Sequence, residues 1–183
     1  MRSFNWNSIE ESNGGGDFTP LPAGPYVAVI IDMVDEPKRE YVNLVYDIAE
    51  GEHKGYYSDD WGKAHPYAHT RKVSYKETVS GQLKGILNRI QRANPGFDPF
   101  AAWDAGRLDM FKNRLVGINL QEEEYENNGE VKTRWFAFCD IVDVDKVRNG
   151  SVKPRPKKTL GGKSATASSN AANDADDFDI PFD

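Results

Sequence analysis

The amino-acid sequence predicts a mainly β protein with one folded domain between two tails. Three observations lead to this prediction: segments with the alternation or β-branched composition of strands, one long amphipathic helical segment, and an Asn-Asn-Gly sequence flanked by strand-like residues. The chain has 183 residues, of which 38% are hydrophobic. That is enough for one core of ordinary size and too little for two.

The domain is predicted to begin with three strands. Residues 26–34 are dense in Val and Ile, and Glu36-Pro37 ends the run as a turn does. Residues 39–48 alternate in polarity, which is typical of a strand with one buried face. The residues expected on that face are Val42, Leu44, Tyr46 and Ile48. After a Glu50-Gly51 turn, the aromatic residues 55–60 form a candidate third strand.

A helix and a hairpin are predicted to follow. Apolar residues between Leu83 and Ile90 recur at i, i+3, i+4 and i+7, which predicts an amphipathic helix over residues 76–92. A second short helical segment covers residues 100–105. Residues 114–121 and 131–144 have strand composition, and Asn127-Asn128-Gly129 between them favours a tight turn because Asn and Gly tolerate positive φ.

This order of elements is typical of an OB-fold, a five-stranded Greek-key barrel with one helix between strands 3 and 4. The predicted OB-fold domain spans residues 23–147, after an N-terminal arm at residues 1–22 that is rich in Gly and Pro. Residues 148–173 form a linker, first basic and then rich in Ser, Ala and Asn, whose composition predicts disorder. Residues 174–183 form an acidic tip.

Charge is strongly segregated near the C-terminus. The net charge is -6, yet residues 148–163 carry six basic side chains and no acid, whereas residues 164–183 carry five Asp and no base. The single cysteine, Cys139, excludes an internal disulfide, and the first residues lack the apolar run of a signal or membrane span. We therefore expect a cytoplasmic protein.

The tip combines acidic and hydrophobic residues in a pattern suited to a basic pocket with an apolar floor. It consists of Asp176, Asp177, Phe178, Asp179, Ile180, Pro181 and Phe182. It resembles the tip of bacterial and phage single-stranded DNA-binding proteins, which join an OB-fold to a disordered linker and the sequence Asp-Asp-Asp-Ile-Pro-Phe. The resemblance implies non-enzymatic binding and protection of single-stranded DNA, and recruitment of replication, recombination or repair proteins through the tip. Asp183 departs from the family pattern, which ends on Phe. An acidic tail that serves only solubility is the alternative.

A second resemblance covers the N-terminal half. Residues 21–29 (LPAGPYVAV), the alternating strand and residues 51–60 (GEHKGYYSDD) resemble a group of small phage-encoded proteins found among replication and recombination genes. This resemblance implies a phage source and a bacterial host cell, and it assigns no role to individual residues.

Residues that interleave aromatic rings with positive charge are the candidates for DNA contact, because aromatic rings stack on bases and Lys or Arg neutralises phosphates. The candidates are Arg39, Tyr41, Tyr56, Tyr57, Trp61, Tyr67, Arg71, Lys72, Tyr75, Lys76, Lys132, Arg134 and Phe136. Packing in the core or at its rim is the competing interpretation for each aromatic residue. The basic part of the linker is either a solvated spacer or an arm that grips phosphate, and it could also pair with the acidic tip.

Other classes of function find less support in the sequence. Gly162-Lys163-Ser164 lacks the first Gly of a phosphate-binding loop, because Lys157 stands at that position. His65 and His69 with Asp59 and Asp60 could hold a metal in a nuclease, but Pro66 and the distance to Cys139 argue against a zinc site, and we expect no metal or cofactor. A phage adaptor that engages host repair proteins without touching DNA remains an alternative. The sequence leaves open whether the chain forms a homo-oligomer.

Overall fold

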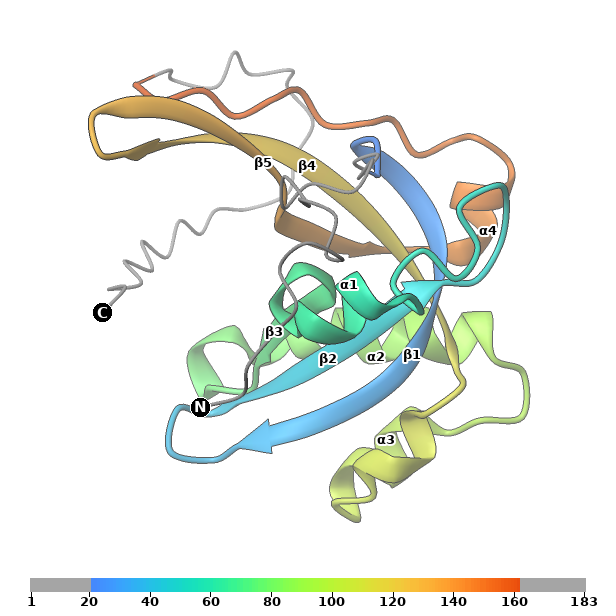
Figure 1. Ribbon diagram of the computed structural model, residues 1–183. Helices are drawn as coiled ribbons and strands as arrows, with labels where there is room; N and C mark the ends of the chain where they lie inside the picture. The colour runs from blue at the N-terminus through green and yellow to red at the C-terminus, as the bar shows by residue number, and fades with distance from the viewer. Residues whose placement is uncertain (1–20, 162–183) are drawn as a thin grey trace, which may run out of the picture.

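The computed structural model describes residues 21–161 and places five strands in one antiparallel sheet (Figure 1). The side chains of residues 60–61 and 135–138 lie outside this description, as do most of the predicted N-terminal arm and the whole acidic tip. The strand order is β3-β2-β1-β4-β5. The strands are β1 (Gly24–Glu36), β2 (Tyr41–Ile48), β3 (Thr70–Ser74), β4 (Leu115–Asn127) and β5 (Glu130–Val142). The prediction of a mainly β fold is confirmed.

The first two strands form close to the predicted positions. The four residues expected on the buried face of β2 are at most 2% exposed. In β1 the register against β2 shifts between Ile30 and Asp32, so that Ile31 is left 46% exposed. An irregularity of this kind bends a strand and increases its twist, which helps a sheet to curl.

The third strand lies at residues 70–74, and the prediction of a strand at residues 55–60 is wrong. Residues 51–58 form successive turns, in which the Lys54 amide donates to the Gly51 carbonyl at 3.2 Å and the Ser58 amide to the Gly55 carbonyl at 2.9 Å. Helix α1 (Asp60–Ala64) then begins inside the predicted strand. The true third strand has one buried apolar residue, Val73, so its composition gives little indication of a strand.

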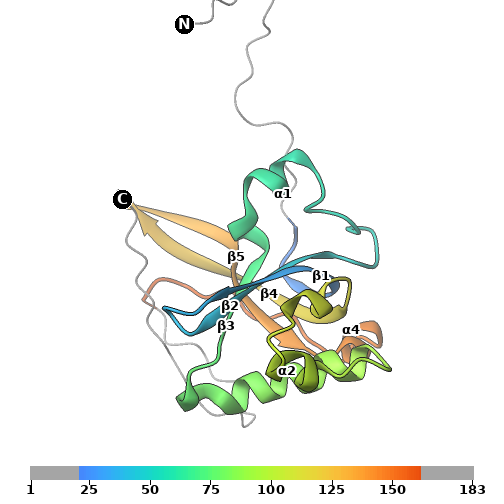
Figure 2. The same ribbon diagram turned by 90° about the horizontal axis from the view of Figure 1, so that it is seen from below.

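The helical segments cover the sheet and connect its strands. The predicted helix is α2 (Ser80–Ala93), which starts later than expected because the 3₁₀ turn η3 (Glu77–Val79) precedes it. The other segments are η2 (Pro66–His69), α3 (Pro99–Asp104), η4 (Leu108–Phe111) and α4 (Val144–Arg148). Figures 1 and 2 show α1 and α2 on opposite sides of strands β1 and β2.

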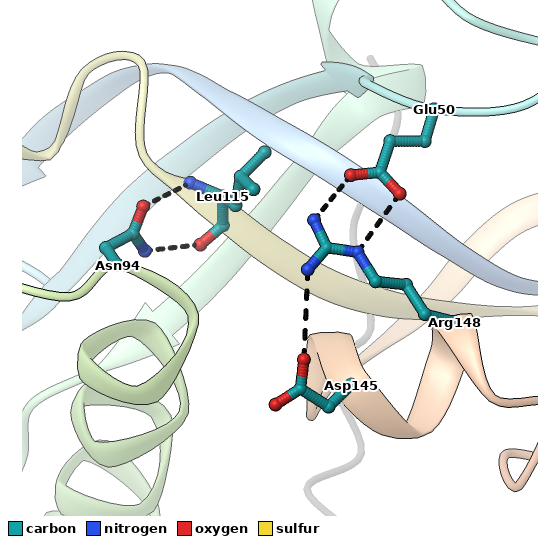
Figure 3. Close-up of polar contacts among 5 residues, drawn as sticks. All are labelled: Glu50, Asn94, Leu115, Asp145 and Arg148. Atoms are coloured by element: carbon teal, nitrogen blue, oxygen red, sulfur yellow. Dashed lines mark hydrogen bonds and ion pairs between the residues drawn. The ribbon is translucent and has the colours of Figure 1, made fainter.

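Asn94 fixes the end of α2 to the start of β4 (Figure 3). Its side-chain oxygen accepts a hydrogen bond from the Leu115 amide at 2.9 Å, and its side-chain nitrogen donates to the Leu115 carbonyl at 2.9 Å. The same nitrogen also donates to the Ile90 carbonyl at 2.7 Å. One side chain therefore closes the helix and satisfies backbone groups of the strand.

The sheet curls until its distant strands share one core. Tyr46 of β2 and Cys139 of β5 are both buried and interact through their side chains, although two strands separate β2 from β5 in the sheet. Within the described residues, the strand pairings include none between β3 and β5. The result is a strongly curled sheet that is left open along the β3 and β5 edges.

No helix within residues 21–161 is both long and apolar enough to span a membrane.

The start of the expected linker is held against the sheet. β1 pairs with β4 only as far as Leu120, which leaves the next part of the β4 edge open. Residues 153–160, here named the basic strap, run beside this edge (Figure 1). The Lys158 amide donates to the Glu122 carbonyl at 2.9 Å, and the Glu124 amide donates to the Lys158 carbonyl at 2.8 Å. Over this range the chain is therefore docked, in contrast to the disorder that its composition predicts.

Candidate nucleic-acid interface

Strands β2 and β3 present a mixed aromatic and basic surface away from the core. Tyr41 pairs with Ser74 and Asn43 with Lys72, while the intervening Val42–Val73 pair is buried. Directly opposite residues of antiparallel strands share a face, and successive residues alternate between faces. Tyr41 and Lys72 therefore lie together on the outer face. The Lys72 ammonium nitrogen lies 5.3 Å from the centroid of the Tyr41 ring.

The β1–β2 turn adds positive charge next to this surface. Arg39 is exposed in the turn, and Glu40 has a φ of 55°, in the left-handed region that closes the turn. The Tyr75 amide donates to the Glu40 carbonyl at 2.9 Å, which ties the end of β3 to the turn. Lys76 follows and is exposed. The structure thus brings five predicted contact residues into one region, namely Arg39, Tyr41, Lys72, Tyr75 and Lys76.

Tyr75 is less available for base stacking than Tyr41. Its hydroxyl donates a hydrogen bond to the Asp35 carboxylate at 3.0 Å, and its ring makes an edge contact with Trp103 at a centroid distance of 6.0 Å. Burial is the main factor that raises the pKa of the Tyr75 hydroxyl, with Asp35 and Glu40 adding to the effect. We therefore infer that Tyr75 holds the end of β3 in place beside the surface and does not stack on a base.

The β4–β5 hairpin carries two further candidates. Asn128 and Gly129 have φ values of 54° and 80°, which confirms the predicted turn. Lys132 lies opposite Tyr125, and Arg134 lies opposite Glu123. The Arg134 guanidinium is hydrogen-bonded to the Glu123 carboxylate at 3.0 Å and lies 5.2 Å from the Tyr125 ring centroid. The tips of this hairpin and of the β1–β2 turn project toward the same side of the molecule in both views (Figures 1 and 2).

The aromatic residues of the β2–α1 connection separate into core and surface positions. Tyr57 is 4% exposed and stacks on the buried His69 ring at a centroid distance of 4.7 Å, so it is a core residue and does not belong to the interface. The Tyr56 hydroxyl accepts a hydrogen bond from the Leu21 amide, and its ring packs against the core. Tyr67 is 61% exposed. The side chains of Trp61 and Phe136 lie outside the described part.

Arg71 lies apart from the outer face. It pairs with Leu44 in the sheet register, so it shares the face that carries the core. It lines a pocket at the open edge of the sheet together with Arg89 of α2 and Asp140 of β5. The amphipathic pattern alone could not indicate Arg89, because a charged residue in a helix is usually assigned to solvent.

Carboxylates of the folded domain pair with the described bases of the basic run. Lys157 pairs with Glu124 at 2.9 Å, Lys158 with Glu123 at 2.7 Å, and Arg155 with Asp140. Figure 3 shows Arg148 of α4 pairing with Glu50 at 2.6 Å and reaching Asp145. These four bases of the run thus have partners within the domain, and the hypothesis that the run pairs with the acidic tip involves residues outside the described part.

The pKa values of these carboxyls follow from the pairing. The Lys157 ammonium beside Glu124 holds the pKa of that carboxyl below its usual value. Burial by itself would raise the pKa of Glu123, but hydrogen bonds from Lys158 and Arg134 outweigh burial and lower it. The strap is therefore held by carboxylates that stay ionised throughout the neutral range.

His69, one of the four residues considered for a metal site, is hydrogen-bonded within the domain. Both ring nitrogens of His69 lie within hydrogen-bond distance of backbone carbonyls, Tyr46 at 2.6 Å and Gly62 at 3.2 Å. Among the described residues, no three or more His, Cys, Asp or Glu side chains form a group that could hold a metal ion. Burial raises the pKa of the Cys139 thiol to about 12, so this side chain is a protonated core residue at neutral pH.

No protein-family model matches this chain, and no curated protein sequence is significantly similar to it.

Proposed function

We propose that this protein binds and protects single-stranded DNA without cleaving it, and that its acidic tip recruits proteins of DNA replication, recombination or repair. The proposed binding of DNA is supported by the arrangement of side chains on the outer face of β2 and β3. There an aromatic ring, Tyr41, and an ammonium group, Lys72, lie side by side on a regular scaffold. Stacking platforms beside positive charge are what sequence-tolerant binding of single strands requires.

The order of the strands supports an OB-fold interpretation. In space the first four strands follow the order β4-β1-β2-β3, which is the order of a Greek key. Helix α2 lies between β3 and β4 in sequence, and β5 adds a hairpin to β4. OB-folds are partly open five-stranded Greek-key barrels that bind oligonucleotides with the β2–β3 face and with the β1–β2 and β4–β5 loops. Seven of the thirteen candidates belong to these three parts of the fold, namely Arg39, Tyr41, Lys72, Tyr75, Lys76, Lys132 and Arg134.

The proposed DNA path crosses the outer face between the two projecting turns. Tyr41 and the exposed Tyr67 supply rings for bases, while Arg39, Lys72, Lys76 and Lys132 supply charge for phosphates. Two acidic residues of the hairpin, Glu123 and Glu124, do not oppose this path with their full charge, because Arg134 and the strap pair with them. A protein with a net charge of -6 can in this way offer a locally favourable surface for DNA.

Recruitment through the tip rests on its sequence. Alternating Asp with Phe, Ile and Pro gives a short peptide that combines charge with apolar anchors, a combination recognised by basic pockets. Asp183 after Phe182 distinguishes this tip from the family it resembles. A variant that lacks only Asp183 tests the role of this residue, with capture of bacterial replication and repair proteins as the measurement. Stronger capture would show that the Asp183 carboxylate weakens docking, and weaker capture would show that it strengthens docking.

A protection assay separates this function from its alternatives. The full chain is mixed with end-labelled oligothymidine, and a single-strand nuclease is then added. We expect the bound oligonucleotide to survive longer than free oligonucleotide, and to stay intact when Mg²⁺ or Mn²⁺ is present without added nuclease. Shortening of the oligonucleotide by the chain itself would indicate a nuclease. Absence of protection would favour an adaptor that does not bind DNA.

A further inference from the structure

The open edge of the curled sheet contains a cavity of about 330 Å³. It is formed by β3, β5 and α2, and we name it the seam pocket. The residues that line it include Arg71 of β3, Asp140 of β5, and Gly81, Gln82, Gly85 and Arg89 of α2. It lies on the core-bearing side of β3, whereas Tyr41 and Lys72 lie on the outer face, so it is distinct from the interface proposed above.

The charge around the seam pocket is positive. Arg71 and Arg89 contribute guanidinium groups from two different elements, and Asp140 is paired with Arg155 of the basic strap. Three guanidinium groups thus surround one carboxylate. Burial raises the pKa of the Asp140 carboxyl even though these arginines oppose the shift, and 23% of this side chain stays exposed.

The helix wall of the seam pocket leaves room for a ligand. A Cβ atom placed on Gly81 would meet no atom within 4 Å, and one placed on Gly85 would meet only Arg89 Nη1, at 3.1 Å. Glycine within a helix costs about 0.5–1 kcal/mol relative to alanine, and no packing contact at Gly81 offsets that cost. The bare backbone lets a group approach α2 closely beside the two arginines.

We propose that the seam pocket binds a phosphate group, held by Arg89 and Arg71 against the backbone of α2. Guanidinium groups match the geometry of phosphate oxygens and bind them through paired hydrogen bonds. This inference rests on the proposed function for the source of the phosphate, which is the backbone or the terminal phosphate of a single strand. The pocket would hold that phosphate on a side of the domain that the stacking surface does not reach.

The test uses inorganic phosphate as the probe and the full chain as the protein. Amide NMR shifts of Gly81 and Gly85 are followed during titration with phosphate, with chloride at matched ionic strength as control. We expect saturable shifts with phosphate and none with chloride. Arg89→Gln should weaken phosphate binding at least about tenfold. Lys84→Gln, on the exposed side of the same helix, is the matched control and should bind as the unmodified chain does.

A second variant separates binding from folding. Gly85→Ala favours the helix but places a methyl group against Arg89 Nη1, so we expect unchanged or greater stability together with weaker phosphate binding. Shifts that occur equally with chloride, or full phosphate affinity in both Arg89→Gln and Gly85→Ala, would overturn the proposal.

Oligothymidine with and without a 5′-phosphate then identifies the source. Stronger competition by the phosphorylated form assigns the pocket to strand ends, and equal competition assigns it to the backbone. If neither form competes, the pocket binds only free phosphate, and the link to DNA is overturned. Loss of oligothymidine binding on the β2–β3 face, with intact phosphate binding in the pocket, would count against the proposed function and not against the pocket.

Discussion

Asp47 lies on the face of β2 where alternation predicts contact with solvent, yet it is only 5% exposed. The β2–α1 connection folds over it. Its carboxylate accepts hydrogen bonds from the amides of Ile48 at 2.7 Å and Tyr57 at 2.9 Å, and from the Ser58 hydroxyl. A single carboxylate thus fixes the turns that replace the third strand expected at residues 55–60.

Replacing Asp47 tests this role at the residue scale. Asp47→Ala leaves two buried amides without their acceptor, so we expect a loss of about 2–5 kcal/mol in the free energy of unfolding. Ser58→Ala removes only one donor at an exposed residue and should cost about 0.5–1.5 kcal/mol. Urea unfolding measures both values. Equal losses in the two variants would show that the carboxylate does not organise the connection.

Tyr41 and Lys72 carry the proposed contact with DNA. Tyr41→Ala should weaken oligothymidine binding by about 1–3 kcal/mol, because one stacking platform is lost. Lys72→Gln should reduce the slope of log affinity against log salt by roughly 0.7, the value for one phosphate on a single strand. Lys54→Gln, an exposed lysine of the β2–α1 connection, is the control and should change neither quantity. Wild-type affinity in both test variants would remove the β2–β3 face from the interface.

At the scale of elements, the sequence predicts those strands, helices and turns that have a local residue pattern of their own. Alternation in β2, the helical spacing of α2 and the Asn-Gly turn of the β4–β5 hairpin all correspond to observed elements. β3 is missed because its strand character comes from pairing with β2, and only Val73 of its five residues is buried. Likewise the strap is missed because its composition is that of a spacer, and its partners on β4 are distant in sequence.

The basic strap provides an electrostatic test at this scale. Glu123 and Glu124 have lowered pKa values when the strap is docked. Their ion pairs therefore stabilise the docked strap fully above the ordinary glutamate pKa, and this stabilisation is lost as pH falls through the lowered pKa values. We therefore expect the Glu124 and Lys158 amides to lose protection from hydrogen exchange below about pH 4, the region of glutamate titration. The Ala49 amide, which donates to the Val27 carbonyl within the sheet, should keep its protection. Simultaneous loss at all three amides would show global unfolding instead.

At the scale of the whole molecule, the pairing of the strands decides which candidate residues lie together. The sequence identifies Tyr41, Lys72 and Arg39 as suitable chemistry, but only the strand register places Tyr41 beside Lys72, with Arg39 in the adjacent β1–β2 turn. It also proposes Tyr57, which the β2–α1 connection buries against His69 in the core. Pairing between strands distant in sequence decides these outcomes, and no local pattern specifies it.

The tip affects DNA binding through charge. Deleting residues 174–183 removes five aspartates from a chain with a net charge of -6. Less repulsion of phosphate should raise affinity for oligothymidine at low salt, and the gain should shrink at high salt, where charges are screened. Fluorescence titration of the full and shortened chains compares them. Equal affinity at low salt would show that the tip neither repels DNA nor competes with it.

Binding of the full chain to oligothymidine at two salt concentrations tests the central claim most directly. The chain contains four tryptophans, whose fluorescence reports binding of bases nearby. We expect saturable quenching at low salt and a lower affinity at high salt, because phosphate contacts release counterions. Failure to bind at low salt would contradict the central claim.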